Sequence, residues 1–316
     1  MNLKLLLSSF FTLMLCVTFA QGKKDSSNVK LAPKYEFWAN KGFDLSIGAG
    51  VYFGNKYNAA YYNGKERNEN DIYFLLRNKW RYDTLYNYVR ENIGYNIGDS
   101  IWVNEEDLPE KMQYKVAYFI SLGVGYRFTK NWALAIHFTN TALTAQDVFL
   151  LRFKTQHGNE KNHADYLECG LQGKEVRNMF DVSVSYTFHP HRHFKPFLEL
   201  GFQLYSLKVK SFNAIIRGKS FNGVRFERSF ELLNYNQNFV PGGQQQDSYI
   251  QYGGTGFGVL GTAGLKIAFN KFFSVDPAFS LSYARMPLEG YKNFKLNYAV
   301  YLRLVVNDLI FSAKKQ

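Results

Sequence analysis

The feature that most constrains the fold is a two-residue rhythm of apolar side chains along much of the chain. In the run Phe43–Phe53 every odd-numbered residue is apolar, and the even-numbered residues are mostly small or polar. Successive side chains of a β-strand point to opposite faces, so such a run has one apolar face and one polar face. Stretches of this kind predict eight strands, over residues 43–54, 115–129, 132–140, 179–188, 196–209, 256–269, 272–285 and 293–305, the last with room to continue to Phe311.

The connections between these strands alternate in length. The short ones are 130–131, 189–195 and 270–271, the long ones are 55–114, 141–178 and 210–255, and 286–292 is of modest length. Outer-membrane barrels have short periplasmic turns and longer external loops, whereas soluble sandwiches do not segregate their loops in this way. We therefore predict an all-β fold, a single antiparallel transmembrane β-barrel of eight strands with long external loops. A further hairpin hidden in a loop stays open.

The N-terminus predicts export. Lys4 supplies a positive start, residues 5–20 carry no charge, and Ala20 provides a small residue at a cleavage site. The run is shorter than the roughly 20 residues of a spanning helix, and Leu15 is too bulky for lipidation at Cys16. The expected organisation is a cleaved signal peptide at 1–20, a periplasmic lead-in at 21–42, a barrel of the Gram-negative outer membrane at 43–311 and a periplasmic tail at 312–316.

The composition limits the kinds of molecule that the chain is expected to bind. Once Cys16 leaves with the signal peptide, Cys169 alone remains, which excludes internal disulfides and makes thiolate metal clusters implausible. Aromatic residues make up 18% of the chain, as the interfacial girdles of a barrel require. The chain carries a net charge of +12. On an exported barrel this charge predicts contact with outer-membrane lipid and the phosphates of lipopolysaccharide, and not with nucleic acid.

An eight-stranded barrel has an interior just wide enough for side chains to fill. The residues expected to face inward include many glycines and a set of acids and bases in near balance. Because buried charges must pair to be tolerated, the sequence predicts an internal salt-bridge network, which argues against an open pore. Its expected members are Asp44, Arg127, Asp181, Glu199, Lys266, Asp276, Arg285, Lys295 and Arg303.

The long connections are expected to carry function. Residues 71–92 are predicted to form a helix capped by Asn70, with an apolar face that packs on the barrel rim or on a partner. That face consists of Tyr82, Leu85, Tyr86 and Val89.

Four patterns are candidates for chemistry, and each has a simpler explanation. The run of His189, His191 and His193 has metal-ligand spacing, but no acid or cysteine lies nearby in sequence. Glu160 and His163, in a loop that also holds His157, Asp165 and Glu168, are more typical of polar surface. The glycines at 253–258 precede a strand and not a helix, as a phosphate loop would require.

His137 is the fourth candidate. Lipid A-modifying barrels use a histidine with a serine or an acid, and Asp181, Ser183 and Glu199 are expected inside the same barrel. His137 lies near mid-strand, however, and not at the rim, so we interpret it as a core histidine.

Two segments carry a family resemblance. Tyr126–Leu134 (YRFTKNWAL) resembles a strand–turn–strand signature of small outer-membrane barrels of the OmpA/OmpX-like kind, and is especially similar to the outer-membrane β-barrel domain families of Bacteroidota. Phe269–Asp276 (FNKFFSVD) repeats the form, and Lys195–Phe197 leading to Gly201 resembles the usual entry into a strand. The resemblance covers about residues 43–311 without the long loops and implies no catalytic residues.

The sequence thus predicts a porin-like but non-enzymatic barrel with no cofactor and no metal. Its long basic and aromatic outer loops are expected to bind a surface molecule or a partner protein. The alternatives are an accessory subunit of an outer-membrane assembly, secretion or uptake complex, a narrow channel and a lipid A-modifying enzyme.

Overall fold

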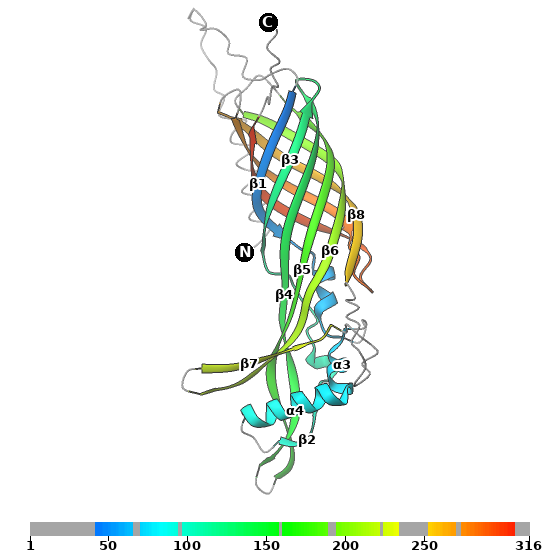
Figure 1. Cartoon of the computed structure of the whole chain (residues 1–316), viewed down its shortest axis with the longest axis vertical. Coiled ribbons are helices and arrows are strands. Elements are labelled where there is room, and N and C mark those ends of the chain that lie inside the picture. The colour runs from blue at the N-terminus through cyan, green and yellow to red at the C-terminus, as the bar shows by residue number, and fades with distance from the viewer. Residues whose placement is uncertain are drawn as a thin grey trace, which may run out of the picture. The chain divides into compact units, whose positions relative to one another are not determined.

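The computed structural model describes residues 42–65, 70–93, 97–157, 160–188, 194–221, 224–233, 252–269 and 273–306. Eight strands among them form a closed antiparallel barrel (Figure 1), in the order β1-β3-β4-β5-β6-β8-β9-β10, with β10 paired with β1. The predicted all-β, eight-stranded antiparallel barrel is therefore confirmed. The strands are β1 (Gly42–Phe53), β3 (Ala117–Arg127), β4 (Trp132–His157), β5 (Glu160–Thr187), β6 (Phe194–Phe221), β8 (Gly253–Ala268), β9 (Phe273–Arg285) and β10 (Phe294–Val306).

The two faces of the barrel are inverted relative to a soluble protein. Large apolar side chains on its outer face are exposed, among them Leu122 at 55% and Leu200 at 72%. The intervening residues point inward and include buried serines, threonines and charged side chains. A polar interior behind an apolar outer face is typical of a barrel surrounded by lipid.

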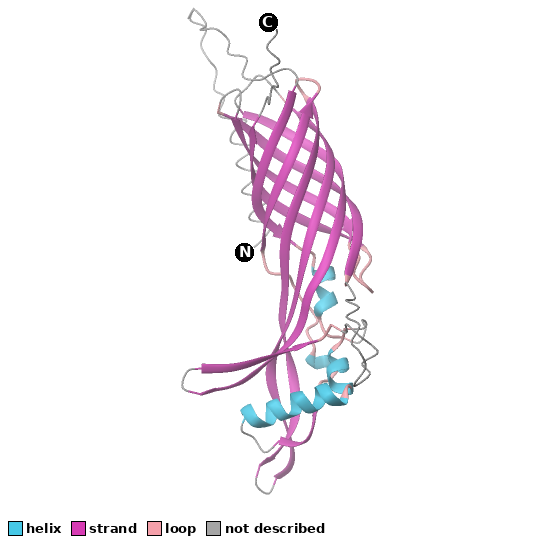
Figure 2. Ribbon diagram, in the orientation of Figure 1, coloured by secondary structure: helices cyan, strands magenta, loops and turns pink. Residues whose placement is uncertain are grey.

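Three strands are much longer than predicted. β1, β3, β8, β9 and β10 begin and end within three residues of the predicted bounds. β4, β5 and β6 instead run far past the ends predicted near residues 140, 179 and 209, and continue beyond the barrel (Figure 2). The prediction that 141–178 and the start of 210–255 are loops is therefore wrong.

The reason is that the apolar residues of these strands change faces part-way along. On β4 the apolar residues are even-numbered up to Phe138 and mostly odd-numbered from Leu143 onward, while the even-numbered side chains face outward throughout. The outer face thus turns from apolar to polar, and the inner face does the opposite. β5 and β6 change at the same paired row, which consists of Asn140, Asn178 and Ser206.

The described residues of 54–116, 141–177 and 207–233, called the extension below, fold around their own core. β2 (Ile97–Trp102) pairs with β4, and β7 (Val224–Glu231) pairs with β6. Short helices complete the fold: α2 (Lys56–Ala59), α3 (Ile72–Arg77), α4 (Lys79–Ile93), and the 3-10 turns η1 (Ala60–Tyr62) and η2 (Glu105–Asp107). The fully buried side chains of this core include Tyr62, Leu75, Leu85, Phe149, Leu171 and Phe212.

The helix predicted over 71–92 is present as α3 and α4. Its N-cap is Asp71, whose Oδ1 accepts a hydrogen bond from the Phe74 amide at 2.7 Å. Asn70, the predicted cap, instead donates from Nδ2 to the Tyr61 hydroxyl at 3.1 Å. The cap therefore lies one residue later than predicted.

The apolar face of α4 packs inside the extension. Leu85 and Val89 are fully buried there, and the Tyr82 hydroxyl accepts a hydrogen bond from the Ile101 amide at 3.1 Å. Neither the barrel rim nor a separate partner is needed to cover this face. Among the described residues, no helix has the length and apolar character to cross a membrane.

Candidate functional site

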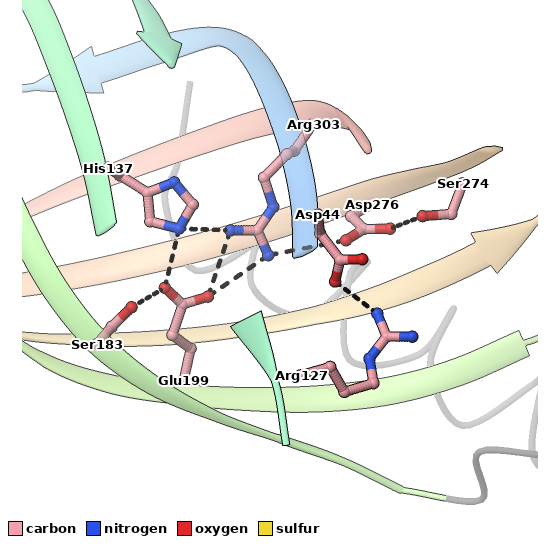
Figure 3. A network of polar contacts seen from close by, with 8 residues as sticks. All are labelled: Asp44, Arg127, His137, Ser183, Glu199, Ser274, Asp276 and Arg303. Carbon is pink, nitrogen blue, oxygen red and sulfur yellow. Dashed lines mark hydrogen bonds and ion pairs between the residues drawn. The ribbon is translucent and has the colours of Figure 1, made fainter. Parts of the chain in front are cut away.

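A buried carboxylate, Glu199 on β6, is the centre of a polar network inside the barrel (Figure 3). Its Oε1 accepts a hydrogen bond from Ser183 Oγ at 2.5 Å, and its Oε2 lies 3.3 and 3.4 Å from Nη1 and Nη2 of Arg303. His137 Nε2 lies 3.4 Å from Oε1. These contacts join β4, β5, β6 and β10 across the interior.

His137 is held between two charged neighbours. Its Nε2 lies 3.1 Å from Nη1 of Arg303 as well as 3.4 Å from Oε1 of Glu199. Gly123 leaves room for the ring, because a Cβ at that position would lie 2.1 Å from Nδ1. His137 is therefore a member of the interior packing.

Two carboxylates extend the network. Asp44 accepts a hydrogen bond from Nη2 of Arg127 at 2.7 Å. Asp276 lies 3.7 Å from Nη2 of Arg303 and accepts a hydrogen bond from Ser274 Oγ at 3.1 Å. Acids and bases thus alternate through the interior, as ion pairing requires.

Most of the charged residues predicted to face inward are buried there. These are Asp44, Arg127, Asp181, Glu199, Lys266, Asp276 and Arg303. Asp181 sits in the cross-strand row of His137 and Gln203. Lys195, which the sequence reasoning missed, is also buried.

Two residues predicted to belong to the buried network, Arg285 and Lys295, do not lie buried in the barrel interior. Arg285 is exposed on the outer face, because nine residues separate it from Asp276 and an odd spacing reverses the face of a strand. Lys295 has the inward register of Arg303 but is only half-buried near the start of β10. Its Nζ lies 4.8 Å from the centre of the Tyr57 ring.

The interior space that remains is small. One cavity of about 50 Å³ and another of about 30 Å³ are both lined by His137, Glu199 and Arg303. A water molecule needs roughly 10–15 Å³ of such space, so each cavity holds a few waters at most.

The geometry does not assemble a nucleophilic relay. The hydroxyl of Ser183 donates to Glu199 and not to His137, and Nε2 of the histidine faces Arg303 and Glu199. A serine nucleophile needs a base within hydrogen-bond reach of its hydroxyl. This arrangement favours the interpretation of His137 as a core residue.

A second buried charge cluster, unforeseen from the sequence, lies where the barrel meets the extension. Glu175 and Arg177 are fully buried, and Oε1 of Glu175 lies 2.6 Å from both Nε and Nη2 of Arg177. Oε2 accepts hydrogen bonds from the hydroxyls of Tyr62 at 2.7 Å and Tyr114 at 3.0 Å. Nη1 of Arg177 donates to the Tyr52 hydroxyl at 3.2 Å.

This cluster ties the segment after β1 to the extended part of β5. Burial first, and then the negative charge of Glu175, hold the pKa of Tyr62 and of Tyr114 well above the ordinary range, so both hydroxyls remain donors. Gly173 is required beside them, since a Cβ there would lie 2.1 Å from the Tyr62 ring. The polar contacts therefore fix the position of the extension over this end of the barrel.

The other candidates for chemistry find little support. His189, His191 and His193 lie outside the described residues. The backbone of Glu160 and His163 is strand and not loop. No group of metal-binding side chains is found among the residues that the structure describes. The glycines at 253–258 begin β8, and no helix follows them, as expected.

Comparison with known proteins assigns no family to this chain. No protein-family model matches the chain, and no curated protein matches it in sequence. Among solved structures the chain is similar to Neisserial surface protein A (9% identity, 85% of this chain and 99% of that chain covered, TM-score 0.38). It is also similar to the attachment invasion locus protein Ail of Yersinia pestis (10%, 84% and 97%, 0.31) and to the outer membrane protein OprG from Pseudomonas aeruginosa (9%, 85% and 97%, 0.34). With TM-scores this low, the barrel assignment rests on the strand pairing alone.

Proposed function

We propose that this chain is a non-enzymatic outer-membrane barrel whose extension stands outside the cell and binds a surface molecule or another protein. The observation that carries the proposal is the change of faces at the row of Asn140, Asn178 and Ser206. On the barrel side of this row the outer face is apolar, and beyond it the apolar residues turn inward around a separate core. A single strand needs such a change only where it passes from lipid into water.

The side of the membrane follows from the lengths of the connections. β4, β5 and β6 run past one end of the barrel, whereas the opposite end has the short turn between β3 and β4 at residues 128–131. Long connections of outer-membrane barrels face outward and short turns face the periplasm. The extension is therefore external, and the signal peptide at 1–20 that export requires stays a prediction.

A binding role fits better than transport or catalysis. The network around Glu199 lines two interior cavities, of about 50 and 30 Å³, and each is too small for a solute. The residues beyond the barrel, in contrast, are ordered by a core and by the buried pair of Glu175 and Arg177. An ordered platform holds its binding surface in one shape, which lowers the entropy lost on binding.

The location is tested by cell fractionation together with a gel that compares boiled and unboiled protein. The proposal expects recovery in the outer membrane and a heat-dependent change in mobility. A soluble periplasmic protein that migrates identically with and without boiling would contradict it.

The binding role is tested by isolating the tagged chain from outer membranes in mild detergent and identifying what co-purifies. Planar-bilayer conductance and analysis of lipid A from a deletion strain complete the test. We expect a retained molecule, no steady conductance and unaltered lipid A. A stable channel, or lipid A that depends on the chain for a chemical change, would overturn the proposal.

A role as a subunit of a larger complex is the second candidate, because α4 exposes a large aromatic side chain. Trp80 is 76% exposed, and the exposed Arg77 and Lys79 lie beside it. Tryptophan and arginine are enriched in the residues that dominate protein interfaces. If this role is correct, a partner protein co-purifies with the chain in fixed stoichiometry. Trp80→Ala should abolish this co-purification, and Lys111→Ala, a change at an exposed site elsewhere in the extension, should leave it unchanged.

A further inference from the structure

We infer that the outer face of β4, β5 and β6 binds a phosphorylated glycolipid of the outer leaflet lengthwise along the strands. The inference rests on the proposed function, since it needs the barrel in the outer membrane with the extension outside. Its basis is the order of side chains on this one face. From the barrel outward, the face presents apolar residues, then amides and a hydroxyl, then lysines, then a second row of amides, then an apolar row with Val148 and Ile215, and finally Glu168 and the exposed Tyr166.

The part of this face nearest the membrane-spanning end suits acyl chains. Phe138, Phe180 and Leu204 pair across the three strands and are 49%, 43% and 47% exposed. They form the last fully apolar row before the change of faces. The next row is that of Asn140, Asn178 and Ser206, in which Asn140 Nδ2 donates to Asn178 Oδ1 at 2.6 Å. This row marks the end of the apolar surface.

Three lysines follow on the same face. Lys208 lies opposite Val176, and Lys174 lies opposite Ser211. A β-bulge between these pairs turns Lys210 outward as an additional residue, so that all three lysines are exposed close together. Diagonal neighbours on a sheet are about 7–8 Å apart, which allows more than one lysine to reach one phosphate group.

The lysines stand at the level where a glycolipid carries its phosphates. Lys208 comes four residues after Leu204, or about 13 Å along a tilted strand, and its side chain can bend back toward the membrane surface. Among the described residues none of the three lysines forms an ion pair. Acids on this side of the sheet begin one paired row farther out, with the exposed Glu231 opposite Asn213, and continue at Glu168. The site is thus locally cationic and suited to phosphate.

The part of this face beyond the lysines suits sugars. Gln146, Gln172 and Asn213 form one paired row, and amide side chains both donate and accept hydrogen bonds as sugar hydroxyls do. In the following row Gly170 lies between Val148 and Ile215. Beyond it Tyr166 is 69% exposed, with an apolar ring and a polar tip.

The continuity of this order selects the occupant. A free phosphate would use the lysines but neither the apolar row nor the amide row. A protein strand cannot add to β5 through its backbone from Gly170 to Thr187, because β5 is already paired on both sides there. A molecule that carries acyl chains, phosphates and sugars in sequence matches the apolar row, the lysines and the second amide row together.

The test is direct binding to the purified full-length protein. The probes are diphosphoryl lipid A, monophosphoryl lipid A and rough lipopolysaccharide with a complete core. The variant Lys174→Gln/Lys208→Gln/Lys210→Gln removes the cations, and Lys79→Gln/Arg90→Gln/Lys111→Gln removes the same charge from exposed positions elsewhere in the extension. We expect the first variant to lose about tenfold to a hundredfold in affinity for diphosphoryl lipid A and to lose its preference over the monophosphoryl form. The second variant should stay within about threefold of wild type.

A second arm tests the sugar part. Tyr166→Ala/Gln172→Ala should weaken binding of core-bearing lipopolysaccharide and leave that of lipid A unchanged. Equal effects of the two triple variants, or equal affinity of the wild type for both lipid A forms, would overturn the inference. The heat-shift gel on the same samples separates the two failures, since a heat-shifted outer-membrane barrel that ignores phosphate keeps the proposed function and removes only this ligand.

Discussion

Replacing Arg177 with methionine tests whether the junction between barrel and extension depends on a buried ion pair. Arg177 and Glu175 are both fully buried, and two nitrogens of the guanidinium lie 2.6 Å from the same carboxylate oxygen. Methionine keeps much of the volume and removes the charge. The Glu175 carboxylate then stays buried with only the hydroxyls of Tyr62 and Tyr114 as donors.

The expected loss of stability depends on the hydrogen bonds that Glu175 keeps in the variant. Removal of one partner of a buried pair destabilises a protein by about 3–5 kcal/mol. The two remaining tyrosine hydrogen bonds to a charged acceptor place the expected loss near the lower end, at about 3 kcal/mol, or about a hundredfold in the opening equilibrium of the extension. The double variant Glu175→Gln/Arg177→Met leaves no buried charge, and we expect it within about 1–2 kcal/mol of wild type.

The assay is protease cleavage within the extension as a function of urea, on protein folded in detergent micelles. The heat-shift gel run in parallel reports whether the barrel is still closed. The charge argument predicts that the double variant is more stable than Arg177→Met alone. It is refuted if the double variant is as unstable as the single one, or if Arg177→Met costs less than about 1 kcal/mol.

Two further predictions concern single positions. Gly123→Ala should destabilise the barrel by about 1–3 kcal/mol, because its Cβ would lie 2.1 Å from Nδ1 of His137, whereas Gly125→Ala, whose nearest neighbour is at 3.5 Å, should be near neutral. Urea midpoints of the two variants check this, and equal shifts would contradict the packing described. For Asp107, hydrogen bonds from Arg152 hold the pKa below its ordinary 3.8, so its contribution to stability is complete above that pH and is lost as the pH falls through the lower folded value. Protease sensitivity of the extension should rise on acidification in wild type and depend less on pH in Asp107→Asn; the same acid response in both would refute this role.

The barrel could be predicted because lipid imposes a strict pattern. Each outward position from Ile120 to Tyr126 is apolar, and the inward ones are two glycines and a serine, so the period of two is plain in the sequence. The same period predicts the interior charges. It also places Arg285 outside, because an odd spacing from Asp276 puts the two side chains on opposite faces, so the prediction that Arg285 faces inward is wrong.

The extension could not be predicted by the same reasoning, because the apolar residues of β4, β5 and β6 do not keep to one face over the whole strand. On β4 the apolar phase moves from even residues at Phe138 to odd residues at Leu143. A search for alternation that permits one reversal would have continued the strand. The pair of Glu175 and Arg177 remains beyond such reasoning, since its tyrosine donors come from sequence positions 61 and 113 residues away.

The most direct measurement of the central claim is labelling of cysteines in intact cells with a polyethylene-glycol maleimide too large to cross the outer membrane. Trp80→Cys places a thiol on exposed α4, Lys130→Cys places one at the short turn after β3, and native Cys169 is buried in the extension. The account predicts that the Trp80→Cys variant is labelled in intact cells, that the Lys130→Cys variant is labelled only after permeabilisation, and that Cys169 is labelled in neither state. Labelling of the Lys130→Cys variant in intact cells would contradict the orientation, and labelling of Cys169 would contradict a folded extension.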